Sequence, residues 1–267
     1  STLAQLAAEK AAVDWSVNCG NMSAALPLWA FEAGLIEVDR RKQTFWIDIR
    51  NTNTGIITGA RLNLGDEGRL KFCSIPGVHG DFPEVDLFLN DPVGNKTGHL
   101  LPTGRVAEEV DGVNVTCLDV AVPMVMVRAA DLGKTANEPM ADLEADDDFR
   151  GRLRRIWVEC GLRMGLTGRD GVRLSPEQLA ASETVPKVCL GGEPEGPGHI
   201  SARYFTPQSG HNSMAVSGGC CLAAACLLEG SVPQQLARNA PAPTGTSAEY
   251  SIDIANPAGV LTALVDA

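Results

Sequence analysis

The sequence predicts an α+β protein made of two similar halves, and three observations lead to this prediction. The chain has 267 residues, 44% of them hydrophobic, which is enough to bury a core in one large domain or two smaller ones. Short runs rich in Val, Ile, Thr and Phe are separated by turn residues over 37–127, a pattern typical of antiparallel strands. Two apolar segments, each between a Cys/Gly loop and a glycine, predict one central helix in each half.

The first apolar segment follows a polar loop that carries Cys19, and it ends at Gly34. Polar residues after the cysteine can cap a helix, and the glycine can supply the left-handed residue that stops it. Pro27 costs about 3 kcal/mol inside a helix unless it falls in the first turn. We therefore expect the helix to start near Ala24 or to be kinked.

The remainder of the first half reads as a curved, mainly antiparallel sheet. Its predicted strands, with the first of the second half, are 44–49, 69–73, 84–89 and 113–120. Between them, 92–105 is rich in Gly, Pro and Thr. Gly94–Gly98 lacks the full spacing of a phosphate loop and its strand-to-helix context, so a structured connection is the favoured interpretation. The predicted domains are 1–112 and 113–267.

The second half repeats the theme of the first. The acidic stretch 142–148 favours a solvated loop and helix start, and 150–164 has the apolar spacing of an amphipathic helix. Strands are predicted over 185–190 and 200–205, followed by a polar loop. The second central helix is predicted at about 217–229 and is stopped by a glycine.

Composition excludes several classes of function. A net charge of −11 and the absence of a Lys/Arg-rich run argue against nucleic-acid binding. No apolar run approaches the roughly 20 residues of a membrane span and no signal peptide opens the chain, so a cytoplasmic protein is expected. The eight cysteines are dispersed and lack zinc-ligand spacing, so we expect no metal and mostly buried thiols.

Cys19 is the first candidate for chemistry. A cysteine just ahead of a helix lies among unpaired backbone N–H groups, which lower the pKa of a thiol and hold anions. This arrangement suits proton transfer on a carboxylate, although a cysteine before an apolar helix is more often a buried thiol. Cys220 and Cys221 begin the second apolar helix in a similar way.

Several motifs follow one another along the whole chain. They are Asn18–Ala25, Lys96–Gly98 with Leu101–Gly104, Thr116–Pro123 with Val127–Asp131, the loops at His211 and Ser217–Gly218, and Asn256–Leu261. Together, and in this order, they resemble the PrpF family.

The resemblance implies a diaminopimelate-epimerase-like fold, with two pseudo-symmetric domains, each a curved β-sheet or barrel around a central helix, and an active site between them. It also implies a cofactor-independent isomerase that shifts a C=C bond by 1,3-proton transfer in an unsaturated di- or tricarboxylate. The substrate types of the family are 2-methylaconitate, methylitaconate and 4-oxalomesaconate. The expected partner is therefore a small carboxylate, and a homodimer is left open.

On this resemblance Cys19 is the expected catalytic residue. From chemistry and position, Lys187, Arg203 and His211 are candidate counter-charges in an otherwise acidic protein, although Lys187 and Arg203 fall in predicted strands and can serve the fold alone. The expected substrate-binding residues are Asn18, Gly20, Asn21, Met22, Ser23, Arg203, His211, Ser217 and Gly218.

The sequence departs from the family in one respect. The family's early Gly-Gly-Thr-Ser-Lys-Gly motif, whose lysine is a proposed proton-transfer residue, has no counterpart, and Lys96 belongs to a different motif. By this resemblance the family's N-terminal segment is lacking, so either the sequence is incomplete or the family reaction is not performed as usually drawn. Two alternatives stay open: a two-cysteine racemase or epimerase on the same fold, and a non-catalytic carboxylate-binding or accessory protein.

Overall fold

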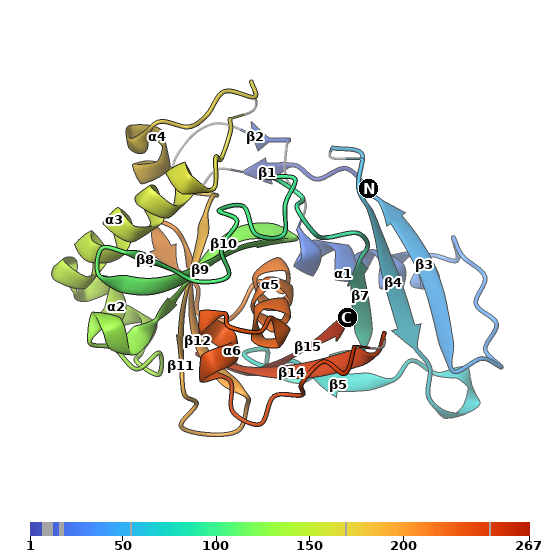
Figure 1. The fold of residues 1–267 in the computed structure, drawn as a ribbon. Helices are drawn as coiled ribbons and strands as arrows, with labels where there is room; N and C mark the ends of the chain where they lie inside the picture. The colour runs from blue at the N-terminus through green and yellow to red at the C-terminus, as the bar shows by residue number, and fades with distance from the viewer. Residues whose placement is uncertain (7–12, 16–18, 54, 169, 246) are drawn as a thin grey trace. The chain divides into compact units, whose positions relative to one another are not determined.

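The computed structural model describes residues 1–267 apart from 7–12, 16–18, 54, 169 and 246 (Figure 1). It is an α+β protein that divides into two compact units, Ser1–Asp91 and Pro92–Ala267. The sequence-based boundary at 112/113 instead falls in the turn between β8 (Glu108–Val110) and β9 (Val113–Val120). These strands pair with each other as a hairpin, which keeps them in one unit. Within the described ranges no helix is long and apolar enough to cross a membrane.

The first unit is built on a three-stranded antiparallel sheet with the order β3-β4-β7. The helix α1 contacts all three of its strands. A short 3₁₀ turn, η1, follows β4 and is the reason that the strand predicted over 69–73 begins late. The bounds are β1 Gln5–Leu6, β2 Val13–Asp14, α1 Gly20–Glu32, β3 Thr44–Arg50, β4 Ile57–Asn63, η1 Asp66–Gly68, β5 Phe72–Ser74, β6 Asp81–Pro83 and β7 Val85–Leu89.

Helix α1 starts earlier than the sequence predicts. It begins at Gly20 and keeps Pro27 inside it, whereas Gly34 has the predicted left-handed conformation, with φ +67°. Ser23 and Pro27 are the buried residues of the helix, while Trp29 is 60% exposed. The sheet of this unit therefore covers one side of α1.

The second unit contains a mixed eight-stranded sheet with the order β15-β14-β12-β11-β10-β9-β8, and β13 pairs with β12. The pairs β10/β11 and β12/β14 are parallel and the others are antiparallel. The remaining strand bounds are β10 Val122–Arg128, β11 Lys187–Gly192, β12 Ile200–Thr206, β13 Ser209–Gly210, β14 Glu249–Asn256 and β15 Gly259–Asp266.

One face of this sheet holds α5 (Val216–Leu227), the predicted second central helix. The helix contacts β9 and β10 and also β14 and β15, although two strands separate these pairs in the sheet (Figure 1). An α-helix with its side chains is only about 10 Å wide, so the sheet must curl around it. Eight of its twelve residues are buried, as a wholly apolar helix requires. The short helix α6 (Val232–Leu236) closes the same core.

The other face of the sheet is covered by α2 (Met140–Ala145), α3 (Asp147–Arg163) and α4 (Pro176–Ala180), with the 3₁₀ turn η2 (Ala129–Leu132) beside them. The predicted apolar side of α3 is confirmed, because its spaced apolar residues are buried against the sheet. They are Leu153, Ile156, Trp157 and Cys160.

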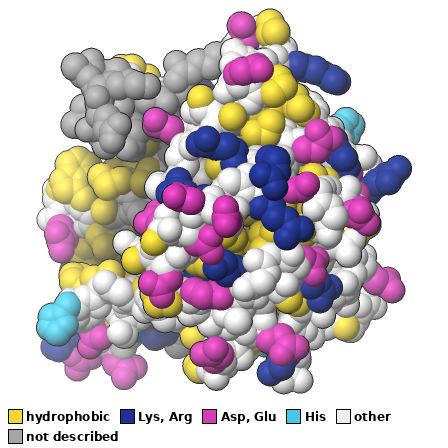
Figure 2. Space-filling model, turned by 90° about the vertical axis from the view of Figure 1, so that its left-hand side faces the viewer, with side chains coloured by type: hydrophobic (Ala, Val, Ile, Leu, Met, Phe, Trp, Pro, Cys, Tyr) yellow, Lys and Arg dark blue, Asp and Glu magenta, His cyan; other side chains and the backbone are white. Residues whose placement is uncertain are grey.

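The outer side of α3 carries arginines. Figure 2 shows Lys and Arg side chains interspersed with Asp and Glu on the side of the molecule where this helix lies. Arg155 pairs with Asp111 at 3.3 Å, and Arg163 pairs with Glu108 at 2.7 Å. These two arginines are therefore paired with carboxylates of the same protein.

Candidate functional site

Cys19 lies at the N-terminal end of α1. It is the N-cap residue, with extended backbone angles, and its carbonyl oxygen accepts hydrogen bonds from the N–H and the hydroxyl of Ser23 at 3.0 and 2.9 Å. The thiol does not cap the helix, and the residue is half-buried. The first N–H groups of a helix have no partner within it, so the sulfur stands beside donors suited to an anion.

A small cavity of about 90 Å³ opens beside this cysteine. Of the predicted substrate-binding residues in this unit, Met22 and Ser23 line it together with Cys19. Its other lining residues are Ser1, Thr2, Leu3, Leu26 and Asn51.

The remaining predicted residues of this loop differ in position. Gly20 opens the helix and Asn21 is exposed, and neither lines the cavity. Asn18 lies outside the described residues. The structure therefore groups three of the six predicted residues of the Cys19 loop around one cavity.

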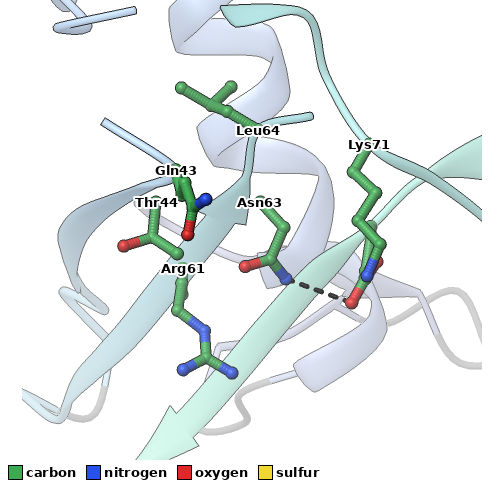
Figure 3. Close-up of a pocket in the computed structure, with 7 residues that line it drawn as sticks. Gln43, Thr44, Arg61, Asn63, Leu64 and Lys71 are labelled. Carbon is green, nitrogen blue, oxygen red and sulfur yellow. Dashed lines mark hydrogen bonds and ion pairs between the residues drawn. The ribbon is translucent and has the colours of Figure 1, made fainter. Parts of the chain in front are cut away.

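A larger hollow of about 430 Å³ lies on the sheet of the same unit (Figure 3). Its charged side chains are satisfied by neighbours: Lys71 pairs with Glu84 at 2.8 Å and Arg61 with Asp86 at 2.7 Å. Asn63 donates to both carboxylates at 3.2 and 2.9 Å. Because its cations are already paired, the hollow is a poor place to hold an anionic ligand.

The N-terminal end of α5 forms a second group of predicted residues, in the other unit. Ser217 and Gly218 occupy its first turn after the N-cap residue Ala215. A Cβ atom on Gly218 would lie 2.9 Å from Cζ of Tyr204 and closer still to its Cε2. Glycine at this position lets the hydroxyl-bearing edge of the tyrosine ring pack directly against the first turn.

His211 approaches the same tyrosine. Its N–H donates to the carbonyl of Tyr204 at 2.8 Å, and the two rings meet edge to face with centroids 6.0 Å apart. Its Nδ1 accepts a hydrogen bond from the N–H of Ser213 at 3.1 Å. This bond assigns the proton of the neutral imidazole to Nε2. His211 and Gly218 thus both lie against Tyr204, and Ser217 precedes Gly218 in the first turn of α5. The tyrosine itself was not among the residues that the sequence predicted.

Arg203 does not join this group. Successive side chains of a strand point to opposite faces, and Tyr204 belongs to the core around α5. Arg203 turns to the other face, where its Nε donates to the carbonyl of Glu138 at 2.6 Å and its Nη1 to that of Ala202 at 2.9 Å. The sequence could not predict this face, because β12 is buried on both faces and shows no alternation that would reveal which face each residue takes.

Lys187 lies on the face of the sheet that packs against α5, opposite to the face on which Arg203 lies. In the β11–β12 pair Cys189 lies opposite Tyr204, and Lys187 is two residues before Cys189 on the same face. The lysine is half-buried, and burial lowers the pKa of its ammonium group from 10.5 to about 8. No hydrogen bond or ion pair holds this ammonium group among the residues the structure describes.

The cysteines of α5 differ from Cys19 in position. Cys220 and Cys221 lie within the helix, past its first turn, and burial raises the pKa of both thiols. Cys221 is fully buried, with its sulfur 3.9 Å from the carbonyl oxygen of Leu118. A thiol that must ionise to take up a proton is disfavoured in such surroundings, so the geometry gives no support to a racemase that uses one thiol from each half.

Comparison with known proteins agrees with the fold and with the motifs. The whole chain, residues 1–267, matches the family described as PrpF protein. It is 35% identical over 267 residues to 4-oxalomesaconate tautomerase of Pseudomonas putida, covering 97% of this chain and 70% of that protein. It is 28% identical over 262 residues to (4E)-oxalomesaconate Delta-isomerase of Novosphingobium sp., covering 98% and 69%.

A solved structure resembles the fold as well. The crystal structure of methylitaconate-delta-isomerase matches with a TM-score of 0.80 and 25% sequence identity, covering 98% of this chain and 69% of that chain. Together with the match over the full sequence, this likeness extends to both units. The chain belongs to the PrpF family.

Proposed function

We propose that this protein is a cofactor-independent isomerase that shifts a C=C bond by 1,3-proton transfer in an unsaturated tricarboxylate such as 4-oxalomesaconate or 2-methylaconitate. The observation that carries the proposal is the 35% identity, over 97% of the chain, to a protein named 4-oxalomesaconate tautomerase. Relatives named 3-methylitaconate isomerase and 2-methyl-aconitate isomerase support the same reaction class. A cytoplasmic location is part of the proposal and rests on the lack of a membrane-length apolar run and of a signal peptide in the given sequence. A homodimer is left open.

The reaction is an isomerisation, so the substrate and the product contain the same atoms. A base removes a proton from the carbon next to the double bond, and the electron pair of the broken C–H bond moves into the allylic system. The negative charge is then shared with a carboxylate or keto oxygen as a dienolate. An acid returns a proton to the carbon at the far end, and the double bond is left one position away.

Cys19 is the proposed proton-transfer residue. Cys19 is half-buried at the N-terminal end of α1, and it lines the cavity together with Met22 and Ser23. Helix N–H groups also stabilise negative charge that develops on a bound carboxylate or dienolate. Gly20, Asn21, His211, Ser217 and Gly218 are proposed to contact the substrate, and this part rests on the family motif and on their places at the two helix ends. The neighbouring Asn18 is proposed on the motif alone.

The proposal is tested by proton NMR in D₂O. The protein is mixed separately with 4-oxalomesaconate, 2-methylaconitate and methylitaconate, and the vinyl and methylene signals are followed over time. Migration of the double bond with deuterium uptake at the new methylene or methyl carbon supports the isomerase and identifies its substrate. Tight binding of all three without exchange would replace it with a carboxylate-binding protein.

Two cysteine variants test the role of Cys19. Cys19→Ala should lower kcat by about a hundredfold or more if the thiol transfers the proton. Cys73→Ala is the matched control, since Cys73 is a second half-buried cysteine in the same unit, in β5. An unchanged kcat in Cys19→Ala would reduce the cysteine to a residue that only lines the cavity.

A further inference from the structure

We infer that Lys187 and Tyr204 form, with the N-terminal end of α5, a binding pocket for one carboxylate group of the ligand. The inference deepens the proposed function, on which it rests for the identity of the ligand as a tricarboxylate. Three independent features of the second unit meet at this place: an unpaired cation, an unpaired buried hydroxyl and a helix N-terminus.

The hydroxyl is the most direct observation. Tyr204 is 1% exposed, and its Oη finds no hydrogen-bond partner in the described part of the chain. A buried hydroxyl without a partner destabilises the folded protein, and native structures rarely contain one without a reason. The ring edge that carries this hydroxyl lies against Gly218, in the first turn of α5. The unsatisfied donor therefore stands at the end of the helix that attracts anions.

Lys187 lies on the neighbouring strand, on the same face of the sheet as Tyr204. Cys189 lies directly opposite Tyr204, and Lys187 is its neighbour on the same face, which makes the lysine and the tyrosine diagonal partners across β11 and β12. Diagonal side chains of this length are within reach of each other. Lys187 is also level with Met124 of β10, whose side chain packs in the core around α5.

The charges around the pocket leave room for an anion. The thiols of Cys189 and Cys221 face the same core, and burial raises the pKa of both, so they stay neutral. His211 contacts the tyrosine ring through its edge. The carboxylate of Asp119 in β9 accepts from the backbone N–H groups of residues 96 and 97 through Oδ2, whereas its buried Oδ1 has no hydrogen-bond partner among the described residues. The ammonium group of Lys187 is thus a charge in the pocket that has no ion-pair partner among the described residues.

An anion that accepts from both an ammonium and a hydroxyl, and that fits at a helix N-terminus, is a carboxylate or a phosphate. The proposed substrates bring three carboxylates and no phosphate, so a carboxylate is the expected ligand. A cation kept half-buried without a protein partner is then explained, because its partner arrives with the substrate.

The test measures binding of propane-1,2,3-tricarboxylate by calorimetry. This compound is saturated, so it cannot undergo the isomerisation and reports binding alone. We expect Lys187→Met to weaken its binding about tenfold or more and Tyr204→Phe about threefold or more, whereas Lys187→Arg should keep most of the affinity. Lys96→Met is the matched control, since Lys96 is an exposed lysine of the same unit.

Thermal melting separates a ligand-binding role from a structural one. Both Lys187→Met and Tyr204→Phe remove a polar group that lacks a partner, so neither should lower Tm without ligand. Lower Tm values in both variants with unchanged affinity would overturn the inference, and so would a wild-type protein that does not bind the probe at millimolar concentration. Probe binding that depends on Lys187, without turnover of any substrate, would refute the isomerase and keep the pocket. Turnover of a substrate by Lys187→Met with an unchanged KM would keep the isomerase and refute the pocket.

Discussion

Asp119 and Thr97 are joined twice, because Oδ2 of the carboxylate accepts the N–H of the threonine at 2.8 Å and its hydroxyl at 2.9 Å. The N–H of Lys96 donates to the same oxygen at 2.9 Å. The segment Gly94–Gly98 is thereby folded onto the end of β9, which confirms the structured connection that the sequence predicted there.

Replacement of this carboxylate should therefore destabilise the second unit. Asp119→Asn removes the charge that strengthens three hydrogen bonds and brings an amide donor toward N–H groups. We expect a loss of about 2–3 kcal/mol in the free energy of unfolding, measured by urea denaturation. Asp266→Asn, at an exposed carboxylate of the same unit, should change it by less than about 0.5 kcal/mol. Equal effects of the two substitutions would contradict this account.

The contact of Gly218 with Tyr204 leads to a second prediction. Gly218→Ala places a methyl group against the tyrosine ring, which must shift or force the first turn of α5 outward. We expect a destabilisation of about 1–3 kcal/mol together with weaker tricarboxylate binding, because the hydroxyl of the ring moves as well. Gly196→Ala is the control, since a Cβ there would meet nothing within 4 Å. A fully stable Gly218→Ala protein would show that the ring has room to move.

The sequence predicted what depends on local pattern. The spacing of apolar residues in α3 predicted its buried side, and Gly34 marked the end of α1. The glycine predicted to stop α5 does not do so, because that helix ends at Leu227 and is followed by the extended residue Leu228, before Gly230. The sequence could not identify Tyr204, because no local pattern indicates that strand pairing and the packing of α5 bring the side chains around this residue together. It also could not assign a face to Arg203, because six of the seven residues of β12 are buried and the usual alternation is absent.

Arg203 should accordingly act on stability and not on binding. Its guanidinium is held by the carbonyl groups of Glu138 and Ala202, on the face of the sheet away from α5. Arg203→Met leaves both carbonyl groups without these donors, so we expect a loss of about 1–3 kcal/mol in the free energy of unfolding. The affinity for propane-1,2,3-tricarboxylate should stay within about twofold at a temperature where the variant is folded. A large loss of affinity with normal stability would return Arg203 to the substrate-binding residues.

The last prediction concerns how stability depends on pH through Lys187. Burial lowers the pKa of this ammonium group to about 8 in the folded protein, against 10.5 for the ordinary side chain. Below pH 8 both states carry the proton, and the cost of burying the charge is fully present. Between pH 8 and 10.5 the unfolded chain binds more protons than the folded one, so this group makes the free energy of unfolding rise with pH.

A comparison with Lys187→Met isolates this effect, because every other titrating group is shared by the two proteins. At pH 7 the variant should be the more stable protein in urea denaturation, and its advantage should shrink steadily between pH 8 and 10.5. Tricarboxylate binding to the wild type should weaken over the same range, since the neutral amine no longer attracts a carboxylate. A difference in stability that stays constant from pH 7 to 10.5 would mean that the ammonium group is better solvated than its position on β11 indicates, and the case for a ligand as its partner would then rest on Tyr204 alone.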